Sequence, residues 1–205
     1  MGKHSQSVDK SILARIYGLG RGAVFTPAKF QDLGSSDAIH NALARYTDAG
    51  TIRKLAHGLY DYPVQHPVLG TVAPSADAIA RALVGRDAIR LQPAGAYAAN
   101  LLGLSDQVPA KVVFLTDGPA RKVRVGNREI ILKRTTPRHM ATAGRKSGTL
   151  IQALRHLGQR HVDDQIIGTL RRQLTAADLA GIRKDLRYAP AWIADILRQL
   201  NEPAS

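Results

Sequence analysis

The sequence contains no cysteine. This absence excludes disulfides, thiol nucleophiles, cysteine-ligated zinc fingers and iron–sulfur clusters, and with them the class of small secreted domains held together by disulfides. No stretch approaches the roughly 18 consecutive apolar residues of a membrane span. The polar residues 1–10 also lack the apolar core of a signal peptide. We therefore expect a cytoplasmic protein that does not act at a membrane.

Acidic residues are also scarce. The 205 residues include 16 Asp and Glu against 29 Lys and Arg, which gives a formal net charge of +13. Such an excess is typical of proteins with a polyanionic partner, most often nucleic acid, although a basic surface that binds nothing is the simpler alternative. Hydrophobic residues make up 44% of the chain, which is enough for a buried core.

Motifs of known catalytic chemistry are missing as well. The seven histidines are scattered with no H-E-x-x-H pair, and there is no G-x-S-x-G nucleophile turn. Residues Gly144-Arg145-Lys146-Ser147 are a poor match to a phosphate-binding loop, because Arg145 interrupts the Gly-Lys-Ser order and no strand precedes them. We therefore predict no catalytic residues, no metal site and no cofactor, and a protein that is not an enzyme.

The first 66 residues combine helical spacing with a hairpin pattern. Apolar spacing predicts a helix over residues 8–17, and Pro27 marks the start of a short second helix. A third helix is predicted over 36–49, and residues 51–55 and 58–62 are typical of two short strands. The buried face of the third helix would hold Ile39, Ala42, Leu43 and Tyr46. Three helices followed by a hairpin predict a winged helix-turn-helix domain over residues 1–66.

A segment with several prolines, residues 64–75, is expected to link this domain to a second one. Patterns there predict a helix that starts after Ser75, a strand over 111–115, and a hairpin around Gly126-Asn127. Helical patterns then continue to the end, over residues 147–157, 162–173, 176–187 and 190–200. The predicted fold class is therefore α+β, with the winged domain followed by a mixed α/β domain over residues 75–205 that ends in helices.

The predicted third helix has a polar face near its N-terminus, the end at which a recognition helix enters the major groove. Asn41 can pair with adenine, and Arg45 with guanine or a phosphate. The two serines at the helix start can bond a phosphate, and the basic hairpin would lie against the DNA backbone or minor groove. The predicted DNA-binding residues are Ser35, Ser36, His40, Asn41, Arg45, Arg53, Lys54 and His57. The alternative is an ordinary amphipathic helix with a solvated face.

The densest positive charge lies outside this domain. Residues 71–145 hold 12 basic and 5 acidic residues. A basic patch follows the predicted hairpin and consists of Arg121, Lys122, Arg124, Arg128, Lys133, Arg134 and Arg138. Its partner could be DNA phosphate, RNA or an acidic protein, and the alternative is an edge strand whose charge prevents pairing with other sheets.

Several stretches resemble a known family. Residues 22–30 (GAVFTPAKF), 42–46 (ALARY) and 50–63 (GTIRKLAHGLYDYP) resemble the N-terminal winged helix of AbiEi-type antitoxins. Residues 94–105 (AGAYAANLLGLS) and 115–119 (LTDGP) resemble the same family, and in particular a DUF6088-like branch. The resemblance covers roughly residues 8–160, and the wing with its G-L-Y sequence is its most specific part.

This resemblance implies a DNA-binding antitoxin and transcriptional autorepressor of a type IV toxin–antitoxin system used in phage defence. Such a protein binds inverted repeats in its own promoter and opposes a nucleotidyltransferase-like toxin encoded beside it. The resemblance assigns DNA reading to the same eight residues. One departure is Asp37, where the family would have a basic residue, so that Asp37 would either cap the helix or accept from cytosine. Two alternatives are a stand-alone winged-helix transcriptional regulator and an RNA-binding protein that uses the basic 121–138 hairpin.

Overall fold

The computed structural model describes residues 2–85 and 89–202, with side chains from residue 8 onward. The chain divides into two compact units, residues 1–86 with 124–126, and residues 87–123 with 127–205. Both helices and sheets are present, which confirms the α+β class.

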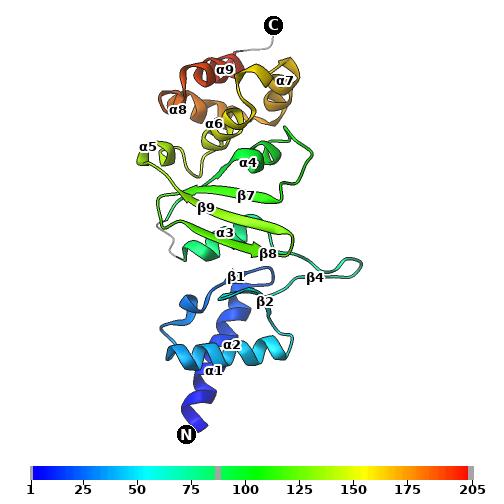
Figure 1. Cartoon of the computed structure of the whole chain (residues 1–205), viewed down its shortest axis with the longest axis vertical. Coiled ribbons are helices and arrows are strands. Elements are labelled where there is room, and N and C mark those ends of the chain that lie inside the picture. The colour runs from blue at the N-terminus through cyan, green and yellow to red at the C-terminus, as the bar shows by residue number, and fades with distance from the viewer. Residues whose placement is uncertain (1, 86–88, 203–205) are drawn as a thin grey trace. The chain divides into compact units, whose positions relative to one another are not determined.

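The first unit is built from helices and a small sheet (Figure 1). Its leading elements are α1 (Gly2–Leu19), β1 (Val24–Phe25), the 3-10 helix η1 (Pro27–Phe30), α2 (Ser36–Asp48), β2 (Arg53–Ala56) and β3 (Leu59–Asp61). The three strands form an antiparallel sheet in the order β1-β3-β2. The predicted helices and the strand pair at 51–62 are therefore present, and the structure adds the short strand β1 as the sheet's third member.

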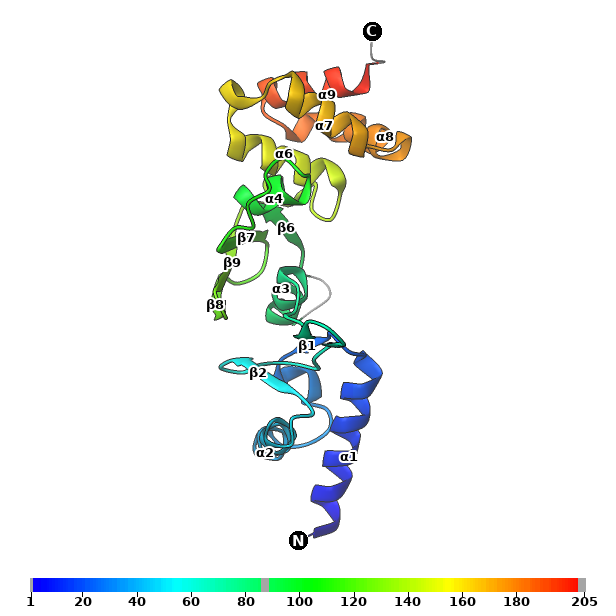
Figure 2. The same ribbon diagram turned by 90° about the vertical axis from the view of Figure 1, so that its right-hand side faces the viewer.

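The core of the first unit lies among α1, α2 and this sheet, and Figure 2 shows the two helices side by side. Ile12 and Ile16 of α1 are fully buried against the apolar side of α2, where the buried residues are Ile39, Ala42 and Leu43. These three confirm most of the predicted buried face, and Tyr46 is half-buried beside them. Phe25 packs edge-on against Phe30 at 5.4 Å between ring centroids.

The predicted linker contains structure of its own. Strands β4 (Gln65–His66) and β5 (Gly70–Thr71) form a small antiparallel hairpin, whose turn is held by the His66 ring nitrogen Nδ1, which accepts from the backbone N–H groups of Val68 and Leu69. Helix α3 (Ala76–Val84) begins at an N-cap formed by Ser75, as predicted. It packs against β1 and so belongs to the first unit, whereas we expected it at the start of the second domain.

The second unit contains a four-stranded sheet, except that the last two residues of its third strand in chain order group with the first unit. Its strands are β6 (Leu91–Ala94), β7 (Lys111–Thr116), β8 (Arg121–Val125) and β9 (Arg128–Arg134), in the order β6-β7-β9-β8. The pair β7–β9 is parallel and the pair β6–β7 is antiparallel. Helix α4 (Gly95–Leu101) packs on this sheet and against α6 (Lys146–Leu157).

The rest of the second unit is helical, as the sequence predicted. After α5 (Pro137–Met140) and α6, the chain forms η2 (Gln159–His161), α7 (Asp164–Gln173), α8 (Ala176–Asp185), η3 (Leu186–Tyr188) and α9 (Ala191–Asn201). Buried residues such as Leu154, Leu170, Ile182 and Leu197 form one continuous core. Helix α8 starts with a capping box formed by Thr175 and Asp178, in which each side chain bonds the other residue's backbone N–H.

Candidate nucleic-acid interface

Helix α2 presents a polar face near its N-terminus. Ser36, Asp37, His40, Asn41 and Arg45 are all exposed, while the apolar residues of the helix face the core. This separation follows from the helical period of 3.6 residues, which puts positions 39, 42, 43 and 46 on one side. The helix therefore displays most of the predicted recognition residues to solvent.

Ser35 begins α2 as its N-cap. The hydroxyl oxygen accepts the backbone N–H of Ala38 at 3.3 Å, which satisfies one of the donors left unpaired at a helix start. The cap is therefore Ser35 and not Asp37, which is exposed in the first turn. The hydroxyl hydrogen of Ser35 stays available to an acceptor outside the helix.

The side chains that follow the cap lie beside a shallow pocket between η1 and α2. Ser36 Oγ and His40 Nδ1 are 3.4 Å apart, and both residues line this pocket of 370 Å³ together with Pro27 and Gln31. Asn41 is exposed, and its amide bonds no residue that the structure describes. Its donor and acceptor are therefore free to pair with a base edge.

Arg45 has a partner inside the protein. Its guanidinium Nη2 donates to both carboxylate oxygens of Asp9 on α1, at 2.7 and 2.6 Å. The neighbouring Tyr46 hydroxyl donates to the backbone carbonyl of the same Asp9 at 2.8 Å. Arg45 therefore joins α2 to α1, although its side chain remains 52% exposed.

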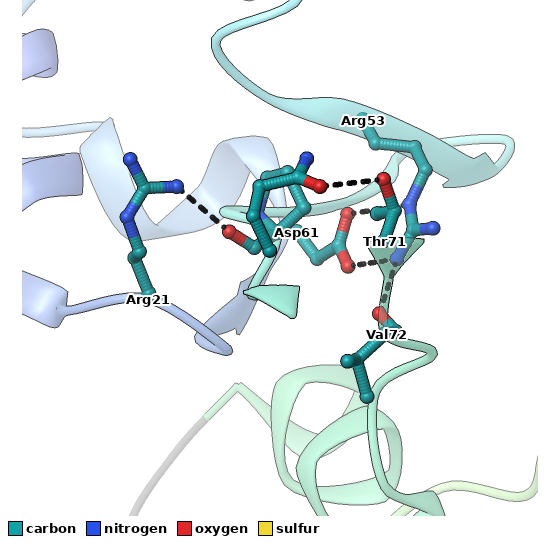
Figure 3. Close-up of polar contacts among 7 residues, drawn as sticks. Arg21, Arg53, Asp61, Thr71 and Val72 are labelled. Atoms are coloured by element: carbon teal, nitrogen blue, oxygen red, sulfur yellow. Dashed lines mark hydrogen bonds and ion pairs between the residues drawn. The ribbon is translucent and has the colours of Figure 1, made fainter. Parts of the chain in front are cut away.

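Arg53 is also paired, as Figure 3 shows. Its Nε and Nη2 donate to the two carboxylate oxygens of Asp61 at 3.1 and 2.6 Å, and Nη2 also donates to the carbonyl of Val72. Asp61 is only 1% exposed, and its hydrogen bond raises the pKa of the Arg53 guanidinium further. Arg53 therefore neutralises a buried carboxylate and fastens the segment after β5 to the three-stranded sheet.

The two remaining predicted DNA-binding residues also lie on the β2–β3 hairpin. Lys54 and His57 are exposed, and neither side chain bonds a residue that the structure describes. Lys54 lies opposite Tyr60 in the β2–β3 register, and His57 stands in the turn between the strands. Of the predicted wing contacts, these two are the ones left for an external ligand.

The seven residues of the basic patch are all exposed. Strands β8 and β9 carry six of them, but the hairpin ends at Arg134, and Arg138 lies on α5. Lys122 pairs with Glu129 at 2.7 Å across the hairpin. The expected 121–138 hairpin is therefore shorter than predicted, because Pro137 starts a helix.

Sequence reasoning missed the carboxylates of Asp9 and Asp61 as partners of Arg45 and Arg53. The only signal for Asp61 is its place between Tyr60 and Tyr62 in a strand, where an acid is unusual. Among the described side chains of residues 8–85 and 89–202, no three His, Asp or Glu residues are grouped so that they could hold a metal ion. Nor does any helix in these ranges have the length and apolarity to cross a membrane.

The fold thus defines an α+β protein whose first unit has a small antiparallel sheet and a helix with an exposed polar face. Residues 11–180 match DUF6088, described as a family of unknown function, and the chain belongs to this family. No curated protein matches it.

Proposed function

We propose that this protein is a sequence-specific DNA-binding regulator whose first unit is a winged helix-turn-helix. The observation that carries the proposal is the exposed polar face of α2, which is followed in the chain by the β2–β3 hairpin with its exposed Lys54 and His57. The element order helix, strand, short helix, helix and hairpin, with sheet order β1-β3-β2, supports the same interpretation. In this arrangement α2 is the recognition helix and β2–β3 is the wing.

The contacts within the protein divide the predicted DNA-binding residues into two groups. His40 and Asn41 would read base edges, while Ser35, Ser36, Lys54 and His57 would bond phosphates. Arg45 and Arg53 are committed to Asp9 and Asp61, so we propose that they hold the helix and wing in place.

The regulator we propose is an autorepressor and antitoxin that opposes a nucleotidyltransferase-like toxin. This part of the proposal rests on the resemblance to AbiEi-type antitoxins. The exposed basic patch is compatible with an acidic protein partner as well as with nucleic acid. Co-expression with a nucleotidyltransferase-like gene encoded next to it tests this role. Rescue of growth supports the antitoxin, whereas unrelieved toxicity favours a stand-alone regulator.

The DNA-binding proposal is tested by fluorescence anisotropy on the gene's own upstream duplex and a scrambled duplex, at about 150 mM salt, where non-specific binding is weak. Asn41→Ala should weaken binding to the upstream duplex by about 1–3 kcal/mol and leave the scrambled duplex unaffected. Gln165→Ala on α7, which truncates another exposed amide, is the matched control. Equal binding of the unaltered protein to both duplexes refutes sequence-specific reading.

The role of the basic patch is separable in the same assay. Changing Arg121, Lys122 and Arg124 to Gln should weaken the dependence of DNA affinity on salt concentration if the β8–β9 hairpin contacts the duplex. An unchanged slope assigns the hairpin to another partner, and single-stranded RNA as competitor then tests the RNA-binding alternative.

A further inference from the structure

The second unit contains a cluster of basic side chains with no acid among them. Its basic members are Arg138 and His139 on α5 and Arg155 on α6, and the neutral Thr135 after β9 is bonded to His139. Arg155 Nη1 is 3.1 Å from His139 Nε2, and His139 Nδ1 is 3.0 Å from Thr135 Oγ1. These bonds join Thr135, His139 and Arg155, while Arg138 precedes His139 in α5 and its charge acts on both His139 and Arg155.

Arg155 is the unusual member. Its side chain is half-buried, and its Nε is fully buried with no hydrogen-bond partner. Among the described residues no carboxylate pairs with it, whereas Arg145, also at α6, pairs with the buried Asp185 at 2.7 Å. The charge of the Arg155 guanidinium is therefore not balanced by any described carboxylate, and an anion that contacts its exposed part would supply that balance.

The neighbouring histidine is held neutral. Arginine can only donate, so His139 Nε2 accepts from Arg155 and His139 Nδ1 carries the proton that it donates to Thr135. Burial, then the charges of Arg155 and Arg138, lower the pKa of His139. Burial and Arg138 also lower the pKa of Arg155. No carboxylate is among the groups that shift either pKa.

We propose that Arg138, His139 and Arg155 form a binding site for a phosphate group. The two guanidinium groups match a dianionic phosphate better than a single carboxylate, because they supply two permanent positive charges and several donors. The phosphate could belong to a free nucleotide or to a nucleic-acid backbone, since both present the same oxygens. The site belongs to the second unit, whereas the α2 residues that we assign to DNA reading belong to the first, and the proposal stands independently of that assignment.

The test is an NMR titration of the full chain with inorganic phosphate, followed through the His139 ring resonances. We expect a saturable shift, and in saturating phosphate the pKa of His139 should move up toward or above its ordinary 6.5. The affinity for phosphate should fall roughly tenfold or more in Arg155→Gln, because each lost bond to a charged group is worth about 1.5–3 kcal/mol. Arg138→Gln, which alters an exposed residue, should also weaken binding and serves if Arg155→Gln does not fold.

Arg160→Gln is the matched control, because Arg160 is an exposed arginine on η2 outside the cluster. The proposal is wrong if phosphate leaves the His139 resonances unmoved, or if the control weakens binding as much as the two cluster variants. A competing DNA duplex then separates the two sources. Displacement of phosphate at His139 identifies a nucleic-acid backbone, and retained phosphate identifies a small phosphorylated molecule, both at the site proposed.

Discussion

Removing the guanidinium group of Arg53 should strongly destabilise the β2–β3 hairpin of the first unit, even though the Arg53 side chain is partly exposed. Arg53 is the ion-pair partner of Asp61, which is 1% exposed, so Arg53→Met leaves a buried carboxylate without its countercharge. Breaking a fully buried pair in this way costs about 3–5 kcal/mol. Because the Arg53 side chain is 36% exposed, water offsets part of this, and we expect about 2–3 kcal/mol, or roughly a hundredfold drop in the folding equilibrium constant.

The assay is urea unfolding followed by hydrogen exchange of the β2 and β3 amides, which reports this hairpin directly. Arg53→Met combined with Asp61→Asn should recover part of the loss, since the buried charge is then gone. Arg15→Met is the control, because Arg15 pairs with Asp32, whose side chain is 63% exposed, and its loss should change the exchange of β2 and β3 little. If Arg53→Met proves as stable as the control variant, Asp61 does not depend on Arg53 and our account of the hairpin fails.

Three further outcomes are expected. Gly148→Ala should destabilise the protein by about 1–3 kcal/mol in thermal unfolding, because a Cβ there collides with the backbone carbonyl oxygen of Thr142 as well as with Gln92 Oε1. Stabilisation, the usual result of Gly→Ala in a helix, would contradict this. Thr175→Ala should cost about 1 kcal/mol by the same measurement, since it removes the N-cap of α8, and an unchanged midpoint would show that the cap contributes nothing. The lowered pKa of His139 means that the unfolded chain takes up its proton near pH 6.5 and the folded chain only at lower pH, so stability falls as pH drops below 6.5. His139→Gln should flatten this fall in urea midpoints measured from pH 8 to 5, and an equally steep fall would disprove the linkage.

Features set by local chemistry were predictable from the sequence. The buried face of α2 follows from helical spacing, and the starts of α2, α3 and α8 follow from serine and threonine caps. The hairpin β4–β5 was not predictable, since its short strands show no alternation of apolar and polar residues. Its turn depends instead on a ring nitrogen of His66 that accepts from two backbone N–H groups.

The candidate site was predictable only as a set of exposed residues. Which arginines are available depends on carboxylates elsewhere in the chain, and the partner of Arg45 is 36 residues away. Periodicity carries no information about such a contact, because tertiary packing alone brings α1 beside α2. The basic charge of Arg45 and Arg53 therefore pointed to DNA, whereas the structure shows both engaged with acids.

That contrast gives a criterion for ranking the basic residues as candidate contacts of an anionic ligand. An arginine that pairs with a carboxylate already has its charge balanced. An external anion must compete with this intramolecular ion pair, and it loses translational freedom on binding whereas the carboxylate of the same chain does not. An unpaired cation has no such competitor, and binding an anion also relieves its repulsion from neighbouring cations. By this criterion Lys54 on β2 and Arg155 on α6 are stronger candidates than Arg45 or Arg53. Of these two, Arg155 is the stronger candidate, because its charge is half-buried and no carboxylate among the described residues balances it, whereas the charge of Lys54 is exposed to water.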